Sequence, residues 1–175
     1  SVHRDGQAAR HALEMARADI AALLGVTPRT LTFTGSGTES IDLAIRGVLG
    51  ASSKNTLITA RTEHAAVRDL AEHLEQTGRA RVVWLDLEPI ERGGTVSLDS
   101  LDAALADHAD TALVSVQWAN NETGVIQPVA QIAERCHAAG VRFHCDAVQA
   151  AGKLPMTPQK RAPSVSDGPN GAQPI

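Results

Sequence analysis

A short glycine-rich segment, Gly35-Ser36-Gly37-Thr38, lies between a β-prone run and an apolar pattern with helical spacing. Glycines let a ligand approach the backbone, and the first N–H groups of a helix have no acceptor within it, so this segment could bind a phosphate. The spacing does not match a Walker loop, and Ser40 stands where the third glycine of a dinucleotide fingerprint belongs. A plain helix-capping turn would use the same residues.

Three further polar clusters each follow a predicted strand. They are Thr62-Glu63-His64, Asn120-Asn121-Glu122-Thr123-Gly124 and Asp146-Ala147-Val148-Gln149. Each has a simpler interpretation, because His64 could be a capping or surface residue, the Asn-Gly run a turn, and Asp146 an N-cap. Since ligands bind at the carboxyl ends of parallel strands, we expect the fold to gather all of these clusters into one cleft.

The elements that position these clusters are predicted from hydrophobic spacing, which alternates between helical and strand periods. Helices are expected at residues 9–24, 38–49, 67–74, 98–105 and 129–136. Strands are expected at residues 31–34, 56–59, 81–85, 112–116 and 141–145. Regular alternation of strand and helix predicts an α/β fold, with a mostly parallel sheet between two helical layers.

Composition limits the class of protein. The chain has 175 residues, 43% of them apolar, which predicts about one domain with a sizeable core. The net charge of −4 is spread over both signs, so neither nucleic acid nor a membrane is an expected partner. The two cysteines, Cys136 and Cys145, form neither a disulfide framework nor a CxxC metal motif. We therefore expect a cytoplasmic protein without a metal site.

Taken together and in order, these segments resemble the cysteine desulfurase family, within the class V aminotransferase group of fold-type-I pyridoxal-phosphate enzymes. The matching stretches are Ser1-Val2-His3, Phe33 to Ser40, Thr62-Glu63-His64, Asn120 to Pro128, His144 to Gln149 and Gly152-Lys153-Leu154-Pro155. The block from Asn120 to Pro128 is the most specific to desulfurases. The resemblance covers about residues 1–155 and implies part of the large domain of a three-layer fold-type-I transferase.

The resemblance also implies that the chain binds pyridoxal 5'-phosphate. Gly37 and Thr38 would bind the cofactor phosphate, where the positive end of the helix dipole favours an anion. His64 would stack on the pyridine ring and take a catalytic part by moving protons.

Three further residues would hold the pyridine ring. Asp146 would pair with the ring nitrogen and keep it protonated, so that the ring accepts electrons from the substrate. Asn121 and Gln149 would donate hydrogen bonds to the phenolic oxygen of the ring. The ring would then be held at its nitrogen and at its oxygen.

Members of the family convert L-cysteine, or selenocysteine, to L-alanine. They use a lysine that forms a Schiff base and a low-pKa cysteine that becomes a persulfide. The persulfide sulfur is passed to acceptor proteins such as iron–sulfur scaffolds, and the full-length enzymes are homodimers. The same partners and the same dimer are therefore expected for the complete form of this protein.

The sequence departs from the family in its lysines and cysteines. The family lysine follows the Gly-Lys-Leu-Pro segment by about twenty residues, and none of Lys54, Lys153 and Lys160 matches it. Cys136 and Cys145 are typical of small core residues, and no counterpart of the catalytic cysteine or of the smaller C-terminal domain is present. We therefore expect a truncated chain that is inactive by itself.

The composition changes at Pro155. Five of the eight prolines lie in the last 21 residues, which predicts a divergent, disordered tail over residues 156–175. A frameshift or an assembly break would explain the change, and sheet edges left open would make the chain poorly soluble. Three alternatives to a desulfurase stay open: an inactive remnant that binds the cofactor or a partner, another class V aminotransferase activity, and an unrelated nucleotide-binding module.

Overall fold

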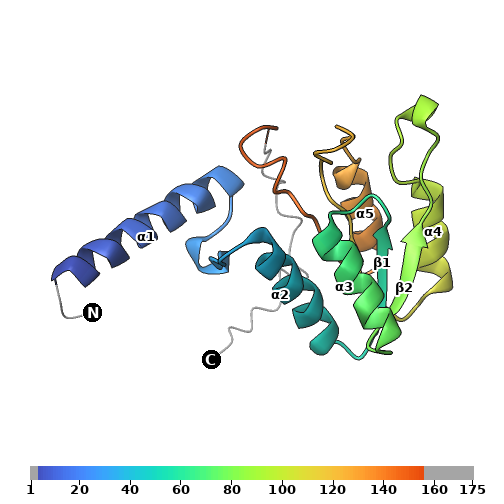
Figure 1. Cartoon of the computed structure of the whole chain (residues 1–175), viewed down its shortest axis with the longest axis horizontal. Helices are drawn as coiled ribbons and strands as arrows, with labels where there is room; N and C mark the ends of the chain where they lie inside the picture. Colours follow the sequence, from blue (N-terminus) through green and yellow to red (C-terminus); the bar gives the residue numbers. More distant parts are fainter. Residues whose placement is uncertain (1–3, 156–175) are drawn as a thin grey trace, which may run out of the picture. The chain divides into compact units, whose positions relative to one another are not determined.

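The structure is a computed structural model that describes residues 4–155. The chain divides into two units, one that includes residues 4–33 and 154–155 and a larger one, Thr34–Lys153 (Figure 1). Three sequence-based predictions lie outside the described residues: the match at residues 1–3, the tail at residues 156–175, and the position of Lys160.

The larger unit is built on a four-stranded parallel sheet. The strands are β1 (Thr56–Ala60), β2 (Arg81–Leu85), β3 (Thr111–Ser115) and β4 (Arg142–His144), in the order β2-β1-β3-β4. Every residue of β1 and β3 is buried, as expected of central strands covered on both faces. The predicted parallel α/β sheet is confirmed, and four of the five predicted strands are correct to within two residues at each end.

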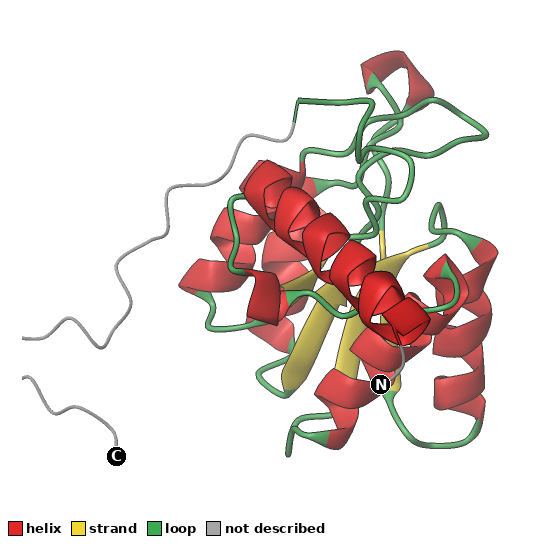
Figure 2. Cartoon of the chain, turned by 90° about the vertical axis from the view of Figure 1, so that its left-hand side faces the viewer, coloured by secondary structure: helices red, strands yellow, loops and turns green. Residues whose placement is uncertain are grey.

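Helices cover both faces of this sheet (Figure 2). On one face lie α2 (Gly37–Gly50) and α3 (Ala65–Gln76), and on the other lie α4 (Leu98–Asp107) and α5 (Val129–Ala138). The predicted arrangement of helix, sheet and helix layers is therefore confirmed for this unit.

Alternation along β1 divides the apolar core in two. Leu57 packs with Ile45 of α2 on one face, while the next residue, Ile58, packs with Ile132 and Cys136 of α5 on the other. Cys136 has no solvent-exposed surface, so its predicted role as a small core residue is confirmed.

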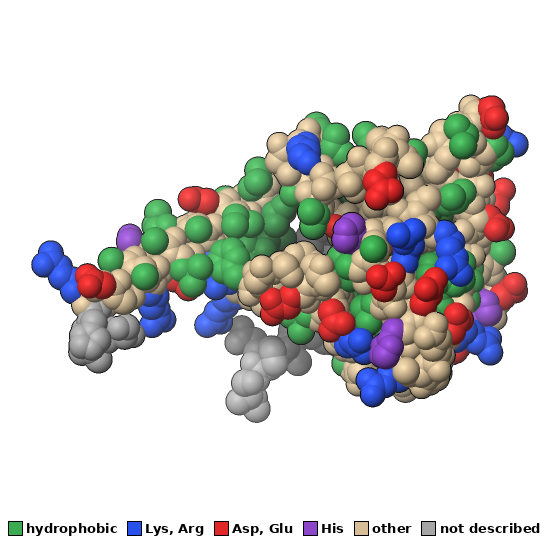
Figure 3. All heavy atoms as spheres, viewed as in Figure 1, with side chains coloured by type: hydrophobic (Ala, Val, Ile, Leu, Met, Phe, Trp, Pro, Cys, Tyr) green, Lys and Arg blue, Asp and Glu red, His purple; other side chains and the backbone are tan. Residues whose placement is uncertain are grey.

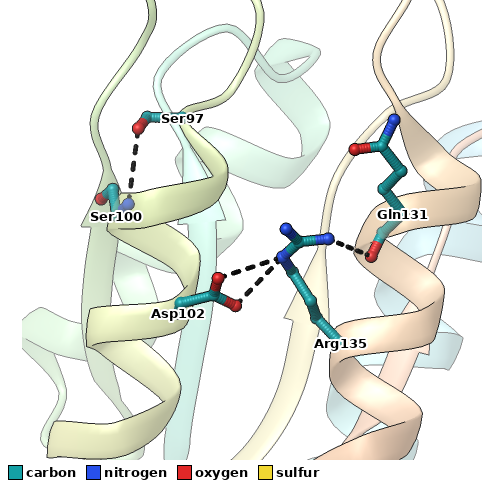
Figure 4. Close-up of polar contacts among 5 residues, drawn as sticks. All are labelled: Ser97, Ser100, Asp102, Gln131 and Arg135. Carbon is teal, nitrogen blue, oxygen red and sulfur yellow. Dashed lines mark hydrogen bonds and ion pairs between the residues drawn. The ribbon is translucent and has the colours of Figure 1, made fainter.

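The helices on the second face are joined by an ion pair, shown in Figure 4. Arg135 Nε of α5 lies 3.0 Å from Asp102 Oδ1 of α4, and the Arg135 guanidinium also donates to the carbonyl of Gln131. Ser97 Oγ accepts a hydrogen bond from the N–H of Ser100 at 3.4 Å and so caps the start of α4. Because both charges are partly exposed, the ion pair adds little stability.

The predicted strand at residues 31–34 is wrong. The chain forms a 3-10 turn, η1 (Pro28–Thr30), and then runs without pairing to another strand. The Arg17 guanidinium donates a 2.6 Å hydrogen bond to the carbonyl of Leu31 and lies 4.6 Å from the centre of the Phe33 ring. A side chain of the preceding helix therefore takes the backbone acceptor that a neighbouring strand would otherwise use.

That preceding helix, α1 (Arg4–Leu24), confirms the long helix predicted at residues 9–24. Several of its apolar side chains are exposed, and Figure 3 shows apolar side chains along it. Met15 is 52% exposed and Leu23 is 58% exposed. The predicted poor solubility stays a prediction. Within residues 4–155, no helix combines the length and the apolar character that a membrane crossing needs.

Candidate functional site

A pocket of about 250 Å³ opens at the carboxyl edge of the sheet. It brings together all six predicted cofactor-binding residues, which are Gly37, Thr38, His64, Asn121, Asp146 and Gln149. These residues come from four separate segments of the chain. The expected gathering of the polar clusters into one cleft is therefore observed.

The position of the pocket follows from the topology of the sheet. The chain leaves β1 for α3 on one face, whereas it leaves β3 for α5 on the opposite face. This divergence opens a crevice between the ends of two neighbouring strands, where ligands of α/β proteins bind. His64 follows β1, Asn121 follows β3, and both line the pocket.

The start of α2 forms one wall. Ser36 Oγ accepts from the N–H of Glu39 at 3.1 Å, and Glu39 Oε2 accepts from the N–H of Gly35 at 2.7 Å. The capping turn considered from the sequence is therefore present. It leaves the N–H groups of Gly37 and Thr38 without acceptors within the helix, at the wall of the pocket. Both interpretations of the segment, as a helix cap and as an anion site, are compatible with the geometry.

His64 is the N-cap residue of α3. Its Nδ1 accepts a 3.1 Å hydrogen bond from the N–H of Ala66. Because an accepting ring nitrogen carries no proton, this contact assigns the proton of a neutral ring to Nε2. The cap thus fixes both the orientation and the tautomer of an imidazole that lines the pocket.

The two adjacent asparagines have different surroundings. Asn120 Oδ1 accepts from the N–H groups of Glu122 and Thr123 at 2.8 and 2.9 Å, and Asn120 Nδ2 donates to the carbonyl of Thr62 at 2.9 Å. Asn120 therefore holds the turn, which is closed by Gly124 at a φ of 73°. Asn121 is the asparagine that lines the pocket.

Asp146 and Gln149 lie beyond the end of β4. Asp146 Oδ1 accepts from the N–H of Val148 at 3.0 Å, so the local capping role considered from the sequence is also present. Lys153 Nζ donates a 2.6 Å hydrogen bond to Gln149 Oε1. Since that contact occupies the carbonyl of the side-chain amide, the Gln149 Nε2 group is the one available to donate to a ligand.

Behind the pocket, the titratable groups are shifted by burial. Burial raises the pKa of Glu63 to about 8, opposed by the hydrogen bond from the Gln117 N–H and reinforced by Asp146. Burial lowers the pKa of His144, whose Nδ1 lies 2.9 Å from Ser115 Oγ. Burial also raises the pKa of Cys145, to about 12. The thiol of Cys145, which is only partly buried, is therefore a weak nucleophile.

Sequence reasoning missed four residues that line the pocket, namely Ile41, Gln117, Ala119 and Val148. Glu63 belongs to the Thr62-Glu63-His64 motif, but its residue type and spacing predict no role for it. One signal was available, since Gln117 is a polar residue that continues the apolar run at residues 112–116. The others have no distinguishing pattern in the sequence.

A family model and sequence relatives both match most of this chain. The aminotransferase class-V family model matches residues 1–162. Cysteine desulfurase IscS of Neisseria meningitidis serogroup A / serotype 4A is 44% identical over 156 residues, which are 88% of this chain and 37% of that protein. The chain thus spans little more than a third of the length of this relative.

Two solved structures share the fold. A NifS-like protein superimposes with a TM-score of 0.82 at 35% identity, over 91% of this chain and 43% of the other. SspA in complex with cysteine superimposes with a TM-score of 0.77 at 31% identity, over 86% of this chain and 42% of the other. The resemblance drawn from the motifs and the three-layer fold are both confirmed by these similarities.

Proposed function

The chain belongs to the aminotransferase class-V family, and from that premise we propose that it forms part of the cofactor-binding domain of a cysteine desulfurase. The substrate of the complete enzyme is then L-cysteine or selenocysteine, and its cofactor is pyridoxal 5'-phosphate. The relative named IscS and the solved relative in complex with cysteine support this choice over another class V aminotransferase activity.

The observation that carries the proposal is the chemistry of the pocket wall. N–H donors at the start of α2 suit a phosphate, and the Asp146 carboxylate suits a protonated ring nitrogen. The imidazole of His64 and the carboxamides of Asn121 and Gln149 also line the pocket. This set of donors and acceptors fits a small cofactor with an anionic group and a flat polar ring.

The residues that line the pocket then have separate tasks. Gly37 and Thr38 bind the phosphate through their N–H groups, and the Thr38 hydroxyl adds a donor. Asp146 holds the proton on the ring nitrogen. When bound, the cofactor supplies a ring that withdraws electrons from the substrate carbon.

The remaining three residues orient the ring and move protons. His64 stacks on the ring and carries a transferable proton on Nε2, because its Nδ1 is occupied by the N–H of Ala66. Asn121 and Gln149 donate to the phenolic oxygen of the ring. The Gln149 amide is oriented for this by Lys153.

As an activity of this chain alone, we propose cofactor binding without turnover. None of the lysines matches the family position, and burial raises the pKa of both Cys136 and Cys145. In the complete enzyme, the sulfur goes to an acceptor protein, the subunits form a homodimer, and the location is cytoplasmic.

The test is to mix the purified chain with pyridoxal 5'-phosphate and reduce the mixture with borohydride. We expect saturable binding without a covalent adduct on Lys54, Lys153 or Lys160, as measured by equilibrium dialysis and mass spectrometry. A lysine that borohydride traps stoichiometrically would show that this chain holds the cofactor covalently. An absence of saturable binding would contradict the proposed site.

A further inference from the structure

Glu63 is a buried carboxyl group directly before His64. It lies in the loop between β1 and α3 and is 3% exposed. Its Oε1 accepts a 2.7 Å hydrogen bond from the backbone N–H of Gln117, just beyond β3. Its Oε2 is buried and has no hydrogen-bond partner within residues 4–155. A buried acid with one partnered oxygen is costly, so its position calls for an explanation.

The hydrogen bonding of the sheet explains the position of Glu63. Past the end of β3, the N–H of Val116 donates to the carbonyl of His144, and the N–H of Trp118 donates to the carbonyl of Asp146. Successive N–H groups of a strand point to opposite sides, so the Gln117 N–H points toward β1. Since β1 ends at Ala60 and its chain turns away to α3, the Glu63 carboxyl takes the place of the missing strand carbonyl.

Two further hydrogen bonds join the same two loops. The side-chain amides of Gln117 and Asn120 both donate to the carbonyl of Thr62, the latter at 2.9 Å. Three contacts therefore connect the segment that carries His64 to the segment that carries Asn121. Of these three contacts, only the hydrogen bond to Glu63 involves a titratable group, so only this one changes when a proton is gained or lost.

Two titratable groups interact electrostatically with Glu63, and both come from the chain at the end of β4. They are the Asp146 side chain and the Cys145 thiol. Burial raises the pKa of Glu63 to about 8, which favours the neutral form of the group at pH 7. Asp146 can then be the negative group next to the ring without a second carboxylate beside it.

We propose that Glu63 is a positioning residue, whose buried carboxyl group joins the His64 loop to the Asn121 loop and so sets the ring-binding half of the pocket. This inference rests on the proposed function. Ionisation of Glu63 would place a second negative charge near Asp146, and only the N–H of Gln117 would donate a hydrogen bond to that charge. Movement of the His64 loop into water would reduce the free-energy cost of the buried charge. The phosphate half is independent, because α2 is capped by Ser36 and Glu39.

The experiment compares binding of pyridoxal 5'-phosphate and of inorganic phosphate to the full chain, in wild type, E63Q and E63A. We expect E63A to weaken cofactor binding about tenfold or more and to leave phosphate binding unchanged. E63Q should bind nearly as wild type, because its amide oxygen still accepts from Gln117. Wild type should lose cofactor affinity as pH rises through about 8, whereas E63Q should lose less. E63Q also corrects for titration of the cofactor itself.

Three outcomes would overturn the proposal: an E63A chain that binds the cofactor as wild type does, an E63A chain that loses phosphate affinity equally, or an E63Q chain with the same pH profile as wild type. If E63A fails to fold, the pH profile of E63Q alone decides.

If wild type binds neither probe, the proposed function fails, and hydrogen exchange of the Gln117 amide then tests the role of Glu63 separately. We expect its protection to fall about tenfold above pH 8 in wild type but not in E63Q, and equal protection in both would reject the proposal.

Discussion

The backbone N–H of Trp118 donates a 2.8 Å hydrogen bond to the backbone carbonyl of Asp146. The parallel pairing of β3 and β4 thus continues beyond the last residue of β4, His144. Asp146 is held by the sheet itself, while its carboxylate is oriented by the N–H of Val148. A side chain positioned at both its backbone and its carboxylate can present a charge to a ligand with little loss of entropy.

We predict that D146N weakens binding of pyridoxal 5'-phosphate by roughly 10- to 100-fold, the range for loss of one hydrogen bond to a charged group. The amide still accepts from the N–H of Val148, so the backbone should keep its place. Binding of inorganic phosphate should not change. Isothermal titration calorimetry with both ligands measures the two effects.

D107N is the matched control, since Asp107 is an exposed carboxylate at the last position of α4. It removes the same charge far from the pocket wall and should leave both affinities unchanged. Equal losses in D107N and D146N would indicate a general effect of net charge, and would contradict a role for Asp146 at the ring.

A second prediction concerns the N–H of Gly37. Proline is tolerated at the first position of a helix, and Ser36 already has the extended backbone (φ −163°, ψ 165°) that a following proline requires. G37P therefore removes one N–H group while α2 keeps its start. We expect G37P to weaken phosphate binding about tenfold, by the loss of one hydrogen bond to a charged group.

G37A is the control for the added carbon. A Cβ at this position would lie 3.4 Å from Val148 Cγ2, which is tight but leaves the N–H in place. G37A should retain most of the phosphate affinity that G37P loses. If both variants lose affinity alike, the added atoms rather than the N–H are responsible. Circular dichroism shows whether α2 is intact in each.

A third prediction concerns stability against pH. Folding raises the pKa of Glu63 from its ordinary value of 4.5 to about 8, so the unfolded chain ionises first. Its contribution is fully present below about pH 4.5 and is lost progressively as pH rises to about 8. The loss is on the order of 3–5 kcal/mol, from about 1.4 kcal/mol per unit of pKa.

E63Q has no proton to lose and isolates this contribution. Urea unfolding at a series of pH values between 4 and 9 should show wild type losing stability relative to E63Q, with a plateau above pH 8. A constant difference between the two chains over this range would mean that Glu63 titrates normally and that burial does not shift its pKa.

Much of the fold was predictable because buried helices and strands have characteristic patterns of apolar residues in the sequence. The runs that became β1 and β3 are apolar and β-branched, and both strands are fully buried. The run at residues 31–34 has the same local character but no strand beside it. Whether a β-prone run pairs with another strand depends on which groups hydrogen-bond to its backbone. The helical spacing around Arg17 does not predict that its side chain donates to the carbonyl of Leu31.

The candidate site was predictable only in part. Asn120 and Asn121 are identical in type, and the family resemblance rather than any spacing selected Asn121 for the ring. The structure separates them, because Asn120 is bound to Thr62 and to its own turn. Glu63 could not be identified as buried, since its burial depends on where β1 leaves the sheet while β3 continues.

The last prediction concerns the two thiols. Burial raises the pKa of Cys136 from 9.0 to about 11, and that of Cys145 to about 12, the latter reinforced by Glu63 and Asp146. At pH 8 the thiolate fraction should be about a hundredfold below that of an ordinary cysteine, or lower, so both should react slowly with Ellman's reagent.

Cys145 provides the sharper test, because it is only partly buried whereas Cys136 is enclosed in the core. If access alone governed reactivity, Cys145 would react readily and C145S would abolish that reaction. If the thiolate fraction governs it, both thiols stay slow in the folded chain and become fast together in guanidinium chloride. A Cys145 that reacts in the native state at the rate of the unfolded chain would contradict the raised pKa. Such a thiol would instead be a candidate nucleophile close to Asp146.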